Sequence, residues 1–362
     1  MRPSQSLPPV PSGSKRPAPA AALFAAAALA ASVLFPSCSG HARPIFALDE
    51  AFAAARPGLA AGLDKGRHLG LGPLGLFGAA LVIPVALTDG AGKALDAAMA
   101  ESKRSGKSCA LFTSPLIAKA IIAAGAWSGD PPLFVPEWHS AAVPSAALPG
   151  LWSATTDPIP AYRQAGSAAG SFVASLSKGG GSPSCGLLFA EAPSRPRAAM
   201  AAFAAAYAEA SEGRPLYVRE LGGSKEEGGA QGKSPQAPEG AAAETAVAEL
   251  LGSDIRVLFV ALGPDSSAAI RAAARPGLAV GADFPYPAAP PSLAFMIVPD
   301  DSGLVRALFS EYRAQLAGAR GGDARSIPSL LVAGDWAGSV PSGKLEFKRF
   351  LENAALRAKG SR

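Results

Sequence analysis

The chain has 362 residues, of which 49% are apolar and only 17% charged, and it carries a formal net charge of +5. This length allows two domains or one two-lobed body with a sizeable core, and three cysteines are too few for a disulfide scaffold. The small charge excess gives no reason to expect a nucleic-acid partner.

Residues 1–37 are predicted to be an export signal. Arg2, Lys15 and Arg16 precede an apolar stretch at residues 20–35 that is short for a membrane span. The following LFPSC (34–38) resembles the lipobox of bacterial lipoproteins, which implies that Cys38 is lipidated and becomes the new N-terminus. Removal of the signal reduces the net charge to +2. An ordinary secretory signal cut near Ser37, or an uncleaved anchor, is the alternative.

Residues 38–78 show little periodicity, so we predict a tether with one short helix at about residues 49–56. A GxGxxG pattern occurs at residues 70–75, but it precedes a strand-like run instead of following one. A dinucleotide site requires the opposite order. We therefore interpret the pattern as a loop.

Strand-like and helix-like patterns alternate from residue 79, and residues 79–158 are predicted to form lobe 1. The predicted strands of this lobe are 79–87, 109–113, 132–136 and 151–154, and its helices are 91–105 and 116–125.

Residues 159–287 are predicted to form lobe 2, with a low-complexity, disordered insertion at 222–240. The clearest alternation runs from 242 to 286, where IRVLFVAL (255–262) is apolar on both faces and favours a parallel strand covered by helices. A further strand is predicted at 278–284. We expect residues 292–325 to complete lobe 1, with a strand at 292–298 that bridges the lobes. Residues 326–362 are predicted to add a C-terminal strand and helix.

Catalytic and metal-binding patterns are weak. Cys109 and Cys185 lie in apolar runs and are predicted to be free, buried thiols. Glu137 and His139 flank Trp138 and would point the same way in an extended segment, but such a pair is more often incidental than metal-binding. We expect no enzymatic activity, no metal and no cofactor.

Three groups of residues carry a resemblance to a known fold. They are Asp157 followed by glycines at 166 and 170, Arg195 or Arg197 with Phe203, and VGAD at 280–283. In this order they resemble the type I periplasmic binding proteins, specifically the basic membrane protein branch of lipoproteins, and the ligand cores of sugar-responsive repressors. The resemblance implies an α/β fold with two Rossmann-like lobes, parallel sheets and a hinge. The phenylalanine and asparagine motifs that members often carry are absent at residues 88–92, which disfavours a nucleoside-type ligand.

Candidate ligand residues follow from the sheet geometry, because loops at the carboxyl ends of parallel strands share one rim beside helix N-termini. Asp and Arg would hydrogen-bond a ligand, and Trp and Phe would stack on it. Each residue could instead be a helix cap or part of the core. The candidates are Thr88, Asp89, Thr113, Ser114, Trp138, Asp157, Arg195, Asp265, Asp283, Phe284 and Tyr286.

The sequence thus predicts a monomeric solute-binding lipoprotein that faces the extracytoplasmic side of a membrane. It would capture a small polar or aromatic molecule and deliver it to the permease of an ABC importer. A structural or adhesive envelope lipoprotein that keeps the fold without a ligand is the alternative. A sensor module is a third reading, although no kinase or transmembrane segment follows.

Overall fold

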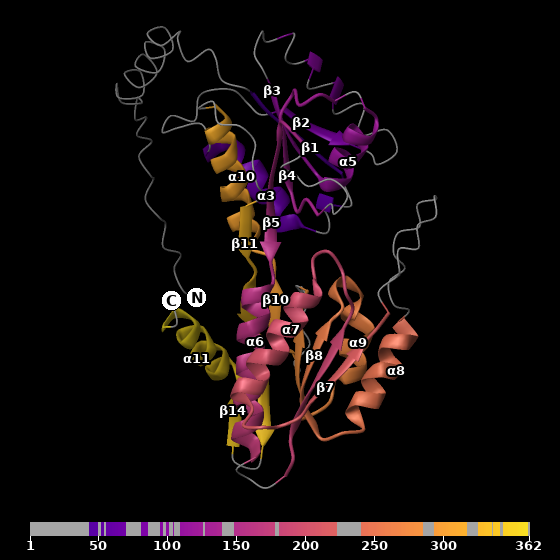
Figure 1. Cartoon of the computed structure of the whole chain (residues 1–362), viewed down its shortest axis with the longest axis vertical. Helices are drawn as coiled ribbons and strands as arrows, with labels where there is room; N and C mark the ends of the chain where they lie inside the picture. Colours follow the sequence, from indigo (N-terminus) through magenta and orange to yellow (C-terminus); the bar gives the residue numbers. More distant parts are fainter. Residues whose placement is uncertain are drawn as a thin grey trace, which may run out of the picture.

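The computed structural model shows two α/β lobes stacked along the long axis of the molecule (Figure 1). The residues that it describes are 43–49, 52–53, 56–69, 81–85, 95–96, 99–100, 104, 109–125, 127–139, 148–177, 181–222, 240–284, 293–316, 325–334, 336–340 and 343–360.

Lobe 1 is a six-stranded sheet in the order β11-β5-β4-β3-β1-β2, and every neighbouring pair is parallel. Its strands are β1 (Arg43–Asp49), β2 (Leu81–Val85), β3 (Cys109–Thr113), β4 (Leu133–Pro136), β5 (Leu151–Asp157) and β11 (Arg325–Pro328). Helices α3 (Pro57–Leu69) and α10 (Asp301–Leu316) cover one face, and α5 (Pro115–Ala123) covers the other.

The predicted tether at residues 38–78 is wrong over much of its length, because β1 and α3 are built from it. β1 lies between β2 and β3, so it belongs to the interior of the sheet. Ile45 faces the α5 side and Phe46 the opposite side, and both are buried. A strand buried on both faces loses the alternation that identifies half-exposed strands, and IFAL is too short to stand out as an apolar run.

A row of aromatic side chains packs across four neighbouring strands of the lobe 1 sheet. Phe46, Phe112, Phe134 and Trp152 occupy matching positions on β1, β3, β4 and β5. Successive ring centroids are 5.0, 4.8 and 5.9 Å apart. Such pairs each contribute about 0.5–1.5 kcal/mol beyond the burial of their surface. Tyr312 of α10 meets two of these rings edge-on, so the row also fixes the position of α10.

Lobe 2 is a second six-stranded sheet in the order β12-β10-β9-β8-β6-β7, parallel except for β12. Its strands are β6 (Ser184–Phe189), β7 (Leu216–Glu220), β8 (Ile255–Ala261), β9 (Ala279–Ala282), β10 (Leu293–Val298) and β12 (Leu330–Ala333). A small hairpin, β13 (Ala337–Val340) and β14 (Gly343–Glu346), follows β12.

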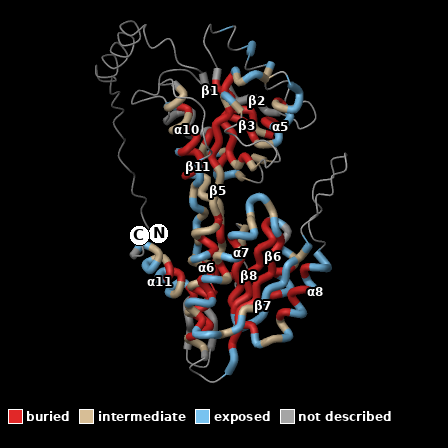
Figure 2. The backbone as a smooth tube through the Cα atoms, viewed as in Figure 1, coloured by how far each residue is buried: buried red, intermediate tan, exposed pale blue. Residues whose placement is uncertain are grey.

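Helices cover both faces of the lobe 2 sheet, which confirms the prediction made from the apolar run at 255–262. Figure 2 shows buried residues concentrated in β6 and β8. The first face carries α6 (Ile159–Ser177), α7 (Arg197–Ala210) and α11 (Phe347–Gly360). The second face carries α8 (Gly240–Leu251) and α9 (Ser267–Ala273).

Two glycines of α6 allow α7 to pack against it at close range. A Cβ on Gly166 would lie 2.3 Å from the carbonyl oxygen of Phe203, and one on Gly170 would lie 2.7 Å from that of Tyr207. Because the obstacles are backbone atoms, no side-chain rotation could relieve them. The glycine spacing of this helix therefore has a packing role and does not mark a ligand contact.

Among the described elements, the chain passes between the lobes three times, and a proline lies at each passage. Pro158 lies between β5 and α6, Pro299 lies between β10 and α10, and Pro328 ends β11 before the chain enters β12. The predicted boundary at residues 292–325 is therefore wrong for β10, which pairs with β9 in lobe 2. Residues from 330 on also return to lobe 2, where α11 packs on α6.

Several sequence predictions fall outside the described residues, among them the export signal and most of the insertion at 222–240. Cys185 is buried and free, as predicted, and burial raises the pKa of its thiol. Within the described part of the chain, no helix is long and apolar enough to cross a membrane.

Candidate functional site

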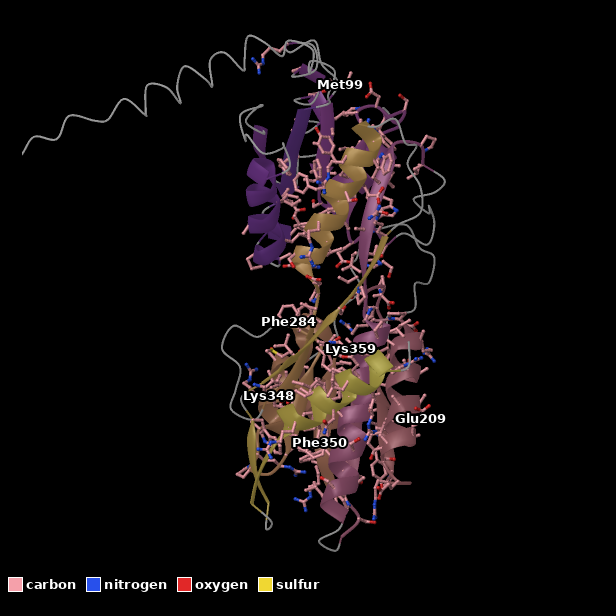
Figure 3. All side chains as sticks on the ribbon, turned by 90° about the vertical axis from the view of Figure 1, so that its left-hand side faces the viewer. Met99, Glu209, Phe284, Lys348, Phe350 and Lys359 are labelled. Carbon is pink, nitrogen blue, oxygen red and sulfur yellow. The ribbon has the colours of Figure 1, made fainter. Side chains whose placement is uncertain are left out.

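A cavity of about 540 Å³ lies between the two lobes. Glu137 and Thr156, at the carboxyl ends of β4 and β5, line it from lobe 1, and Gly263 and Asp283, which follow β8 and β9, line it from lobe 2. Figure 3 shows Phe284 where the two lobes meet. This is the rim-to-rim arrangement expected when two parallel sheets direct their strand ends at each other.

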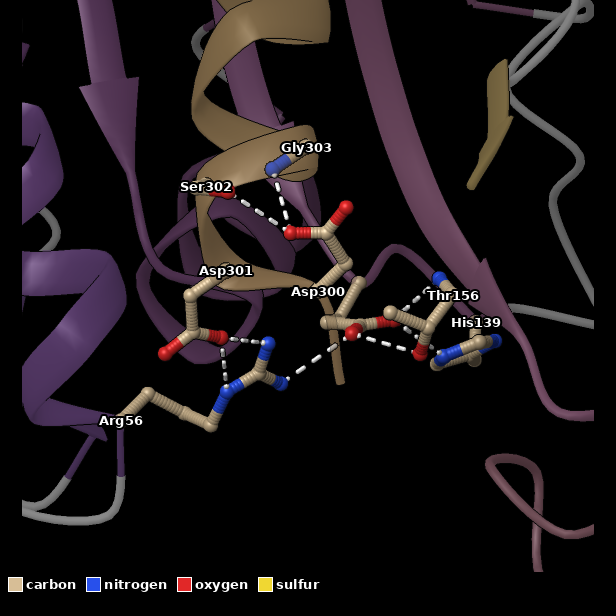
Figure 4. Close-up of polar contacts among 8 residues, drawn as sticks. Arg56, His139, Thr156, Asp300, Asp301, Ser302 and Gly303 are labelled. Atoms are coloured by element: carbon tan, nitrogen blue, oxygen red, sulfur yellow. Dashed lines mark hydrogen bonds and ion pairs between the residues drawn. The ribbon is translucent and has the colours of Figure 1, made fainter. Parts of the chain in front are cut away.

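The lobe 1 rim is organised around Arg56, which precedes α3. Its Nε donates to Oδ1 of Asp301 at 2.9 Å, and its Nη1 donates to Oε1 of Glu137 at 3.1 Å. Figure 4 shows Arg56 extending toward Asp301 at the start of α10, with Thr156 and His139 on its other side. Asp300 accepts a 2.8 Å hydrogen bond from the Gly303 amide and so caps α10. This cap fixes Asp301 as the first residue of the helix. The rim therefore joins three segments that are distant in sequence.

Glu137 is the most heavily hydrogen-bonded group of this rim. Besides Arg56, it accepts bonds from the amide and the hydroxyl of Thr156 at 3.0 and 2.8 Å, and His139 Nε2 lies 3.1 Å from its Oε2. Burial alone would raise the pKa of Glu137, but its partners His139, Thr156 and Arg56 outweigh burial and lower it to about 2. Its backbone has φ 54°, a conformation that residues other than glycine rarely adopt. Glu137 is therefore a fixed anion.

The lobe 2 rim is organised around Asp283. Its Oδ1 accepts a 2.7 Å hydrogen bond from the Gly263 amide, and its Oδ2 accepts one from the Tyr162 hydroxyl at 3.2 Å. Arg195 Nε lies 3.3 Å from the same oxygen. Burial raises the pKa of Asp283, because only 3% of the side chain is exposed and these three partners offset the lost hydration in part. Burial, with the Asp283 carboxylate nearby, also raises the pKa of Tyr162.

Arg195 is held by only one of its nitrogens. Its Nε also donates to the carbonyl of Ala190 at 3.0 Å, whereas its two Nη groups make no hydrogen bond or ion pair with any described residue. The guanidinium lies over Gly263, and a Cβ at that position would lie 2.2 Å from Nη1. Gly263 also has φ +63°, a conformation that favours glycine. The Nη fork therefore stays available at the cavity wall.

Apolar side chains supply much of the remaining wall. Phe52 contributes from lobe 1 and Phe284 from lobe 2, and Ile297, Val298 and Pro299 line the hinge side. A ligand could therefore be contacted by flat apolar surface while its polar atoms meet the two rims.

Of the residues predicted to touch a ligand, Arg195, Asp283 and Phe284 line the cavity. Trp138 does not, because it is buried in the core beneath α5. Thr113 and Ser114 are also buried away from the cavity, and the Ser114 hydroxyl donates to the carboxylate of Asp49.

Asp157 has a capping role at the hinge, where its Oδ1 accepts a 2.9 Å hydrogen bond from the amide of Ile159 in α6. Its neighbours Thr156 and Pro158 line the cavity, but Asp157 does not. Asp265 lies in the short helix η2 (Gly263–Ser266), and its side chain falls outside what is described. Thr88, Asp89, Tyr286 and Cys38 likewise lie outside the described residues.

Sequence reasoning missed most of the lobe 1 rim, including Arg56, Thr156 and Asp301, as well as Tyr162 in lobe 2. Glu137 and His139 were a detectable signal, because their side chains do contact each other. The contact forms through a turn with φ 54° at Glu137, however, and not through the extended segment that the expectation assumed. Their spacing could not reveal Arg56 as the third member. Among the described residues, no cluster of three or more metal-ligating side chains occurs.

No known family model matches the chain, and no curated protein does. Several solved structures do match the chain. A protein assigned as a ribose operon repressor from Burkholderia thailandensis is 11% identical, covers 81% of this chain and all of its own (100%), and has a TM-score of 0.50. An ABC transporter solute-binding protein from Aeropyrum pernix K1 is 14% identical, with coverages of 88% and 86% and a TM-score of 0.49. A LacI transcriptional regulator from a Rhodococcus species is 15% identical, with coverages of 81% and 97% and a TM-score of 0.47.

The chain therefore has the two-lobed α/β fold of type I periplasmic binding proteins and LacI-type regulators, as the sequence predicted. These neighbours are binding proteins and transcription regulators. At these identities the likeness concerns the fold alone.

Proposed function

We propose that this chain is a solute-binding lipoprotein that captures a small polar or aromatic molecule between its lobes. The observation that carries this proposal is the interlobe cavity, into which each lobe directs one arginine–carboxylate cluster from the carboxyl ends of its strands. A purely packed interface would not need buried charges at that place.

The two rims would contribute differently to binding. The Nη groups of Arg195 would donate to oxygen atoms of the ligand, while Phe52 and Phe284 would contact its apolar or aromatic faces. The three proline-containing passages would let the lobes close on the ligand as rigid bodies. Glu137 and Asp301 would keep Arg56 and the start of α10 in place during closure.

The cellular setting of the proposal comes from the sequence. Lipidation at Cys38 would hold the protein on the extracytoplasmic side of a membrane, and an ABC importer would receive the ligand. The resemblance of the sequence to the basic membrane protein branch of lipoproteins supports this setting.

A structural envelope lipoprotein without a ligand is the second candidate. The observation that favours it is the pairing of charges within each rim, since Glu137 has Arg56 and Asp283 has Arg195 as a partner from the same lobe. Such a protein would keep its fold and show no ligand-dependent stability.

Thermal unfolding of the soluble chain from residue 39 on, measured with sugars, amino acids, nucleosides and short peptides, separates the two candidates. Binding at a hundredfold excess over Kd adds about 2.7 kcal/mol of stability. Arg195→Ala should abolish the shift. Arg197→Ala, which removes an exposed arginine two residues away, should leave it intact. A chain that responds to none of these ligand classes would be assigned to the structural candidate.

A further inference from the structure

The short distance between Cys38 and the folded body has a geometric consequence. Arg43, where β1 begins, is the fifth residue after Cys38. A fully extended chain of five residues spans at most about 18 Å. We propose that the end of lobe 1 at which its strands begin rests against the phospholipid surface that holds the anchor. This inference depends on the membrane anchoring that is part of the proposed function.

The anchor point is rigid because β1 is an interior strand. It is hydrogen-bonded to β2 on one side and to β3 on the other, and Ile45 and Phe46 are buried on opposite faces. The strand cannot peel away to lengthen the tether without exposing both cores. If the apolar stretch at 20–35 stays uncleaved, Arg43 is the eighth residue after Phe35, which allows a reach of at most about 29 Å. Both kinds of anchor therefore keep this end of lobe 1 close to the bilayer.

The direction of the strands shows which end of lobe 1 is meant. All its strands are parallel, and Glu137 and Thr156, at the ends of β4 and β5, line the cavity. The strands therefore begin at the end of lobe 1 that is remote from lobe 2, and Figure 1 shows β5 pointing from there toward the hinge. The cavity consequently faces away from the anchored end.

Two described turns of this end are closely packed against each other. The turns before β4 and β5 meet there, and a Cβ on Gly150 would lie 2.2 Å from the carbonyl oxygen of Gly129. The amide of Leu133 donates to the Gly150 carbonyl at 2.8 Å. Ser128 and Asp130 are exposed on the same turn. Packed turns with exposed polar side chains can lie on lipid headgroups without deep insertion.

This orientation places the cavity at a defined distance above the bilayer surface. α10 runs from Asp301 at the cavity to the anchored end, and its 16 residues correspond to about 24 Å. Lobe 1 would then be the fixed lobe and lobe 2 the lobe that moves when the cavity closes. A long flexible tether would impose neither property.

The test compares two serines that occupy equivalent places in the two lobes. Ser128 is exposed before β4 at the outer end of lobe 1, and Ser182 is exposed before β6 at the outer end of lobe 2. Ser128→Cys and Ser182→Cys, each in the full lipidated chain, would carry a fluorescent donor in vesicles of phosphatidylglycerol and phosphatidylethanolamine with acceptor-labelled headgroups. The length of α10 alone would place position 182 about 24 Å farther from the bilayer than position 128. We therefore expect energy transfer from position 128 to be at least about threefold stronger than from position 182.

A lengthened tether provides the control. Insertion of 20 Gly and Ser residues after Gly40 adds a mean reach of about 25 Å and should remove most of the difference between the two positions. Equal transfer from both positions in the unmodified chain, or stronger transfer from position 182, would overturn the proposed orientation while leaving ligand binding intact. If the wild-type chain carried no more fatty acid than Cys38→Ala and stayed in the soluble fraction, the anchoring itself would be refuted. The thermal-shift result of the preceding section would still stand in that case.

Discussion

The two rims of the cavity both contain an arginine and a buried carboxylate, but the pKa of the carboxylate is shifted in opposite directions. The pKa of Glu137 in lobe 1 is lowered to about 2 and that of Asp283 in lobe 2 is raised. Glu137 is bonded by Arg56, His139 and two groups of Thr156, whereas Asp283 has the Gly263 amide, Tyr162 and a 3.3 Å contact with Arg195.

The arginines differ as well. Arg56 uses Nε, Nη1 and Nη2 on carboxylates of its own lobe, while the described contacts of Arg195 use Nε alone. The lobe 1 rim therefore has the contacts of a structural clamp, whereas the lobe 2 rim retains the donors that the proposed function assigns to a ligand. Substitutions in the first should mainly reduce stability, and substitutions in the second should mainly reduce binding.

The largest effect is expected for Glu137→Ala. The change removes the acceptor of Arg56 Nη1, of the Thr156 amide and of His139 in a site where the Glu137 side chain is only 10% exposed. Removing one partner of a buried charge pair costs about 3–5 kcal/mol of unfolding free energy. Urea denaturation would measure it. Glu191→Ala, which breaks an exposed pair with Arg197, should change stability by less than about 1 kcal/mol. Equal effects would contradict the clamp.

The next effect is on the dependence of the unfolding free energy on pH below pH 4.5, which is called the acid limb here. Because the pKa of Glu137 is about 2 in the folded chain against an ordinary value of 4.5, its contribution is present above pH 4.5 and is lost as the pH falls toward 2. The shift corresponds to about 3 kcal/mol. Urea unfolding of Glu137→Gln should show a flatter acid limb than that of wild type.

Asp283 should act with the opposite sign in the same measurement. Its folded pKa lies above the ordinary 3.8, so the unfolded chain ionises first as the pH rises, and stability falls until the folded pKa is passed. Asp283→Asn should remove this decline and make the rise of stability with pH steeper. A steeper rise in Glu137→Gln and a flatter one in Asp283→Asn would reverse the assignment of the two rims.

A smaller effect separates the arginines. Arg195→Lys replaces a planar fork by a point donor and should weaken ligand binding about tenfold to a hundredfold, with little change in unfolding free energy. Arg56→Lys should instead lower stability and affect binding only slightly, since its fork is occupied by Asp301 and Glu137. Titration calorimetry and urea unfolding of both variants would show whether the roles divide in this way.

The smallest effect concerns the glycine beneath Arg195. Gly263→Ala and Gly277→Ala both place alanine at positive φ, of +63° and +79°, which costs about 1 kcal/mol. Only at Gly263 would the new methyl group meet Arg195, because no atom lies within 4 Å of a Cβ at Gly277. We expect similar losses of melting temperature but weaker ligand binding, by about tenfold, for Gly263→Ala alone. Unchanged affinity in Gly263→Ala would show that Arg195 does not need this space.

The sequence by itself determined the alternation of strands and helices, the parallel character of the β8 region and the place of Arg195, Asp283 and Phe284 at one rim. These features depend on local periodicity and on short apolar runs that are visible without knowledge of partners. Cys185 was predictable as a buried free thiol for the same reason.

Only the tertiary structure decided which strands share a sheet and which charges meet. β1 was hidden because an interior strand of a parallel sheet needs no alternation, and β10 could be assigned to lobe 2 only through its pairing with β9. Arg56 and Asp301 are 245 residues apart in sequence and meet because α3 and α10 pack on the same face of lobe 1. Patterns along a chain report the burial of each residue, whereas the choice of a distant partner depends on strand order and helix packing.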